Sequence, residues 1–136
     1  MPVNYRSGLG SVGSYQVSGV PYITGSGENG LPAVGEHKIE FPSVAKSVLV
    51  INTDPVGTTA AVLRVHFVPR DAGNVYSNFH YATLNERTDA MTFNVKCKEI
   101  YISTASGTPG SYEVIAELTG IAPTEMFSLT GSGLTE

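Results

Sequence analysis

The feature that most limits how this chain can fold is a hydrophobic period of two residues, repeated in one segment after another. In the segment 112–118, Glu113 and Glu117 alternate with apolar side chains, namely Tyr112, Val114, Ala116 and Leu118. Such alternation is typical of a β-strand that buries one face. No segment shows convincing spacing for an amphipathic helix. The sequence therefore predicts an all-β protein.

The predicted strands follow one another at intervals of about ten residues, which is typical of sandwiches and barrels. They cover residues 15–24, 37–41, 46–53, 60–68, 75–84, 91–103 and 112–118. Turns rich in Gly, Pro, Asn and Asp separate them. We expect an antiparallel β-sandwich, jelly-roll or immunoglobulin-like, with roughly seven to eight strands.

Individual positions refine this expectation. Pro21 lacks an N–H donor, so its strand is expected to break there or to lie at an edge, and Pro42 is expected to end the strand 37–41. Residues 48–51 are apolar on both faces, which favours a central strand. Between Cys97 and Glu99 the alternation slips by one residue, which indicates a β-bulge or a strand that passes between sheets.

One domain, residues 14–122, accounts for the predicted strands, with an N-terminal arm at 1–13 and a C-terminal tail at 123–136. Both ends are rich in Gly and Ser. They are either flexible or ordered only in an assembly, as arms between subunits. Candidate assembly contacts are the apolar residues of these ends and one outward aromatic, namely Tyr5, Leu9, Val12, Tyr76, Met126, Phe127 and Leu129.

The charge balance argues against nucleic acid as a partner. The net charge is −4, and the eight basic residues are scattered, whereas binding a phosphate backbone needs clustered Lys and Arg. Only 15% of the residues are charged, against about 25% in an ordinary protein. We find neither a secretory signal pattern nor an apolar stretch that would span a membrane, so we expect synthesis in a reducing cytoplasm and no membrane partner.

No residue pattern predicts catalysis, a cofactor or a metal. His37, His66 and His80 lack metal-ligand spacing. Alternation turns Cys97 inward between two outward lysines, which predicts an inert thiol. His66 shares an outward face with Arg64, so it is either an ordinary structural or surface histidine or a pH sensor at an interface. We expect that the protein is not an enzyme.

Two segments, SYQVSGVPYITGS (Ser14 to Ser26) and FNVKCKEIYIS (Phe93 to Ser103), resemble small β-sandwich virion proteins of marine tailed bacteriophages. The resemblance implies a capsid decoration, or cement, protein that bridges capsomers. Its partners would be the major capsid protein and copies of itself, in a trimer, and it would be found in the virion. Two alternatives stay open. The first is a tail, neck or fibre component, and the second is a glycan-binding sandwich module that uses Tyr76 as an aromatic platform.

Overall fold

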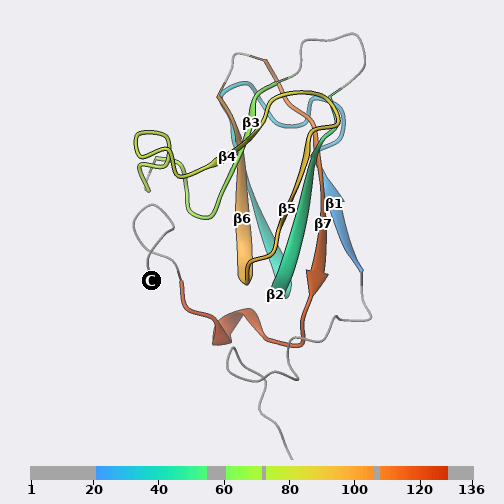
Figure 1. Ribbon diagram of the computed structural model, residues 1–136, viewed down its shortest axis with the longest axis vertical. Coiled ribbons are helices and arrows are strands. Elements are labelled where there is room, and N and C mark those ends of the chain that lie inside the picture. Colours follow the sequence, from blue (N-terminus) through green and yellow to red (C-terminus); the bar gives the residue numbers. More distant parts are fainter. Residues whose placement is uncertain (1–20, 55–60, 72, 106–107, 129–136) are drawn as a thin grey trace, which may run out of the picture.

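A computed structural model describes residues 21–54, 61–71, 73–105 and 108–128 (Figure 1). It confirms an all-β fold. The described residues form seven strands in one antiparallel sheet and one turn of 3-10 helix. The elements are β1 (Tyr22–Gly25), β2 (Glu36–Asn52), β3 (Leu63–His66), β4 (Ala82–Leu84), β5 (Ala90–Phe93), β6 (Cys97–Thr104), β7 (Tyr112–Leu118) and η2 (Pro123–Glu125).

The long strand β2 joins the two halves of the sheet. Its first part pairs with β6, which continues to β3 and β4. Its second part pairs with β7 on one side and with β5 on the other, and β7 continues to β1. The register shifts between Glu40 and Ala45, and again between Ala45 and Ser47. Such irregularities bend a strand, and here they let β2 belong to both halves.

Both halves of the sheet contribute to one hydrophobic core, which gives the molecule its sandwich-like character. Alternate residues of every long strand point into it, as the sequence predicts for 112–118. The fully buried members include Val48, Val50, Leu63, Ile102 and Val114. Because residues 48–51 pair on both edges, the prediction of a central strand is confirmed.

The sequence-based predictions for Pro21 and Pro42 have different outcomes. β1 begins directly after Pro21, and among the described strands it pairs only with β7, so the predicted edge strand is confirmed. The prediction that Pro42 ends a strand is wrong, since β2 runs through it. Pro42 lies where the register shifts between Glu40 and Ala45, and a proline is tolerated at a bulge because no ladder donor is required there.

The segment 91–103 is two strands rather than one. Residues 94–96 separate β5 from β6, although both strands pair with β2. The irregularity expected between Cys97 and Glu99 is present, but the extra residues lie in β2, the partner strand, and not in β6. Glu99 pairs with Glu40 and Cys97 pairs with Ala45, so β2 advances further than β6 between these two pairs.

Two other predicted strands are shorter than expected. β3 covers Leu63–His66, and only Ala82–Leu84 of the segment 75–84 is a strand. Backbone hydrogen bonds from Asn78 to Asn74 and from His80 to Val75 turn the chain there instead. Asn74 has φ of 49° and Phe79 has φ of 58°, values that interrupt an extended strand.

The chain packs on the domain beyond the predicted boundary at residue 122. After η2, Met126 is buried with Val44 and Ile121 in a second, small apolar cluster. The Lys98 ammonium donates to the Met126 carbonyl at 3.2 Å and to the Ser128 hydroxyl at 3.0 Å. Residues 123–128 are therefore fixed to the sandwich, and the N-terminal arm 1–13 lies outside the described residues.

Candidate functional site

Strand pairing brings a set of polar side chains together on the outer face of β2, β6 and β3. In one row, Ser103 of β6 pairs with Glu36 on one side and Arg64 on the other. In the next row, Tyr101 lies between Lys38 and His66. Residues two apart share a face, so both rows point away from the core. A polar outer face is what a half-buried antiparallel sheet is expected to carry.

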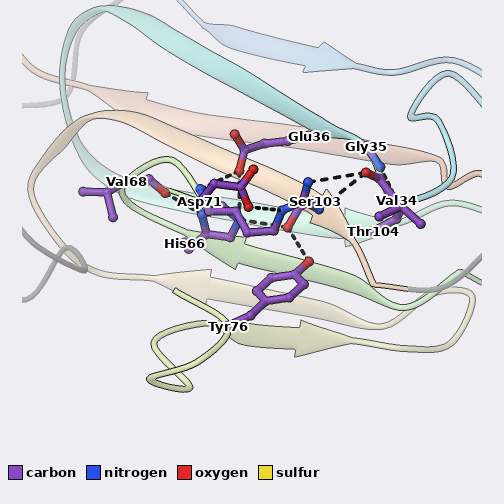
Figure 2. A network of polar contacts seen from close by, with 10 residues as sticks. Val34, Gly35, Glu36, His66, Val68, Asp71, Tyr76, Ser103 and Thr104 are labelled. Atoms are coloured by element: carbon purple, nitrogen blue, oxygen red, sulfur yellow. Dashed lines mark hydrogen bonds and ion pairs between the residues drawn. The ribbon is translucent and has the colours of Figure 1, made fainter. Parts of the chain in front are cut away.

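His66 is fully buried at the centre of this face (Figure 2). Its Nδ1 lies 2.7 Å from the Val68 carbonyl oxygen, and its Nε2 lies 2.8 Å from the Ser103 hydroxyl. Its ring stacks on Tyr101 with 5.9 Å between centroids and an interplanar angle of 4°. Burial lowers the pKa of His66 below its ordinary value of 6.5.

The hydrogen bonds of this network have one consistent direction when His66 is neutral. A carbonyl only accepts, so Nδ1 carries the proton and Nε2 accepts from Ser103. The Ser103 oxygen then accepts from the Tyr76 hydroxyl at 2.7 Å. Glu36 lies 3.7 Å from Nε2 and accepts the Arg70 backbone N–H at 2.8 Å. Each member is thus held by its neighbours (Figure 2).

A turn-rich segment covers the network from outside. We call residues 69–71 and 73–81 the aromatic cover. Tyr76 and Tyr81 of the cover lie 4.4 Å and 4.3 Å from the Arg64 guanidinium, measured to the ring centroids. Arg70 lies 5.4 Å from the Tyr76 ring. Cation–π contacts of this kind stabilise by about 0.5–2 kcal/mol each, so the two contacts of Arg64 fix the cover on β3.

The Ser103–His66 pair has the spacing of a nucleophile and its base, but its surroundings are those of a structural network. Ser103 is fully buried within β6, and its hydroxyl is engaged by both His66 and Tyr76. His66 is oriented by a backbone carbonyl through Nδ1, while Glu36 faces the other nitrogen. This geometry ties β3, β6 and the cover together. The absence of enzymatic activity stays a prediction.

The residues singled out in the sequence have separate locations. Tyr76 belongs to the cover, where it contacts Arg64, Arg70 and Ser103. Met126 is an internal anchor, and Phe127 beside it is 41% exposed. The other candidate contacts, Tyr5, Leu9, Val12 and Leu129, lie outside the described residues.

The structure places both single titratable residues that the sequence singled out. His66 and Arg64 do share an outward face, and the cover buries His66, so it is a structural histidine rather than a surface one. The aromatic-rich sequence from Tyr76 to Tyr81 was the available signal for this cover. Cys97 is buried as predicted, and burial raises the pKa of its thiol to about 12.

A second buried polar group lies at the end of β2 and was missed in the sequence. The Asp54 carboxylate accepts backbone N–H groups from Ala61 and, at 2.9 Å, from Ser111. The Asn52 amide donates to the Ala61 and Leu84 carbonyls, both at 3.1 Å. Asn and Asp in this stretch predict a turn, but their burial depends on strands distant in sequence. This group stabilises the junction of β2, β7 and β4.

Among the described residues, no group of three or more His, Cys, Asp or Glu side chains is placed to hold a metal ion. The same part of the chain contains no helix that is long and apolar enough to cross a membrane. Comparison with protein-family models, with curated proteins and with solved structures finds no match to this chain.

Proposed function

We propose that this protein is a structural component of a tailed-bacteriophage virion, and that it acts as a capsid decoration protein which bridges neighbouring capsomers. The resemblance of two segments to such proteins suggests this role. A decoration protein resists the outward pressure of a packed genome by contacting several neighbours at once. It needs a firm body and contact surfaces, and it needs no reactive centre.

The observation that carries the proposal is the distribution of side chains between interior and surface. The chemically versatile side chains His66, Ser103 and Cys97 are buried and engaged in the fold. Large apolar side chains are instead displayed on several parts of the surface, namely Ile23, Val34, Phe79, Met91, Val95, Ile115 and Phe127. Single exposed apolar residues are common, but a set spread over several strands and turns suits a protein with several neighbours.

The copy number in purified virions tests this role. A decoration protein is expected in hundreds of copies per particle, which quantitative gel electrophoresis against the major capsid protein measures. Because many modest contacts act together, avidity holds such a protein on the shell. A handful of copies per particle would favour the tail, neck or fibre alternative, and absence from the particle would exclude all virion roles.

A further inference from the structure

The outer face of the other half of the sheet carries a row of aliphatic side chains, and on β7 this row lies between the outward Glu113 and Glu117. Ile115 of β7 pairs with Ile23 of β1 on one side and with Leu49 of β2 on the other. Ile51 follows two residues after Leu49 on the same face. We call Ile23, Leu49, Ile51 and Ile115 the aliphatic stripe. The residues between them, such as Val50 and Val114, point into the core.

The aliphatic stripe is accessible and differs from the rest of the outer surface. Ile23 is 67% exposed and Ile115 is 38% exposed, while Leu49 and Ile51 are half-buried. The outer face around His66 is polar and carries its own cover, as described above. An outward sheet face in contact with water is expected to be polar, so a continuous aliphatic row across three strands indicates a contact surface.

The dimensions of the stripe favour a single extended segment as its occupant. Three adjacent strands span about 10 Å, and residues two apart on a strand are separated by about 7 Å. A face-to-face dimer of standard size needs roughly 800 Å² from each partner, which is several times the area of four aliphatic side chains. An extended segment that runs along the strands places alternate side chains about 7 Å apart, which is the spacing of Leu49 and Ile51 within β2.

Residues 1–20 of the chain have the right composition for this occupant. They include Val3, Leu9, Val12 and Val17, separated by small or polar residues. They carry one basic residue, Arg6, and no acidic residue. Beside the stripe, the exposed Glu113 lies between Gly25 and Ile51 in the next row of the sheet. The apolar composition of the segment therefore suits the stripe, and the charge of Arg6 complements Glu113.

We propose that residues 1–20 of one copy dock on the aliphatic stripe of a neighbouring copy. The segment precedes the edge strand β1, and twenty residues reach at most about 70 Å, which is enough to contact another copy. This inference deepens the proposed function, on which it rests, by naming the contact between copies.

Disulfide trapping in the full-length protein tests this docking. Copies carrying Ile115→Cys are mixed with differently tagged copies carrying Val12→Cys or Leu9→Cys, and are oxidised mildly. Cys97 is left in place, because its buried thiol with a pKa of about 12 does not compete. We expect cross-links between copies at least tenfold above those of a Phe79→Cys control, whose site is 76% exposed but lies on the aromatic cover. Equal yields would overturn the proposal.

A chain that carries Ile115→Cys together with Val12→Cys shows whether the docked segment comes from the same chain or from a neighbouring copy. We expect linked copies, whereas bonds formed only within one chain would overturn docking between copies. In a second measurement, Ile115→Asp should weaken self-association at least tenfold in sedimentation, while Phe79→Asp should not. An unchanged Ile115→Asp variant would contradict the proposal. Cross-linking in solution without incorporation into virions would contradict the decoration role alone, so the two failures are distinguishable.

Discussion

At the scale of single residues, Asp54 shows how a buried carboxylate organises this fold without a cationic side chain beside it in the described residues. It is 1% exposed and accepts two backbone N–H groups, from Ala61 and Ser111. Leaving a buried donor without a partner costs about 1–3 kcal/mol. Asp54→Ala should therefore lower the free energy of unfolding by about 2–4 kcal/mol, measured by urea denaturation. Asp71→Ala, at a side chain that is 93% exposed, is the control and should change it by less than about 0.5 kcal/mol.

His66 should make stability depend on pH. Burial lowers its pKa in the folded protein below the unfolded value of 6.5, and Arg70 adds to this, whereas Glu36 and the Val68 carbonyl oppose it. The unfolded state then binds more protons below pH 6.5, so stability is complete above that pH and is lost as the pH falls through it. Burial raises the pKa of Tyr101, whose ring stacks on His66, so this phenol stays neutral in this range.

The predicted change is a lower urea midpoint at pH 5.5 than at pH 7.5. The slope of the unfolding free energy can reach about 1.4 kcal/mol per pH unit for one group. His66→Gln should reduce the difference between the two midpoints, while His37→Gln, at a half-buried histidine bonded to Tyr112, should preserve it. A His66→Gln protein with the full pH dependence would show that another group is responsible.

At the scale of elements, Gly110 illustrates how closely the strands approach. It forms a bridge with Leu31 before β7 begins. A Cβ at this position would lie 2.7 Å from Leu63 Cδ2 and 3.2 Å from Thr104 Cγ2. Gly110→Ala should therefore destabilise the protein by about 1–3 kcal/mol. Gly120→Ala is the matched control, because no atom lies within 4 Å of its added Cβ. Equal thermal midpoints for both variants would contradict this account.

The segment after β7 offers a second test at this scale. Met126 is buried with Val44 and Ile121, whereas Phe127 is 41% exposed. Met126→Ala should remove about 2–5 kcal/mol of packing from this attachment, so residues 123–128 should be cleaved faster in limited proteolysis, by tenfold or more. Phe127→Ala should leave the rate within about twofold. Similar rates for both variants would mean that Met126 does not anchor the segment.

The strands that the sequence predicted well are those in which burial depends only on alternation. β7 has the predicted bounds and the predicted inward residues, and Cys97 is inward. The features that the sequence did not predict are those that packing between distant segments decides. Pro42 is tolerated because β2 changes register there. His66 is buried because Tyr76 and its neighbours fold over it, a contact that local periodicity does not encode.

At the scale of the whole molecule, the described residues form a firmly connected body with two contrasting outer faces. One face is polar and covered by its own aromatic segment, and the other carries the aliphatic stripe. The low proportion of charged residues suits close packing among neighbours. Both properties are compatible with the proposed virion role, in which the body provides stiffness and the chain ends provide reach.

Deletion of residues 1–13 tests separately the stability of the folded body and the role of the N-terminal arm in assembly. The buried core described here is formed by residues from Leu31 onward, so the truncated protein should keep the thermal midpoint of the full chain within a few degrees. The same truncation should fail to be incorporated into virions, because it lacks Tyr5, Leu9 and Val12. Incorporation is measured by complementing a phage that lacks the gene and quantifying the protein in purified particles. Incorporation at the full-length level would refute a role of residues 1–13 as an assembly arm, and a large loss of stability would show that these residues belong to the folded body.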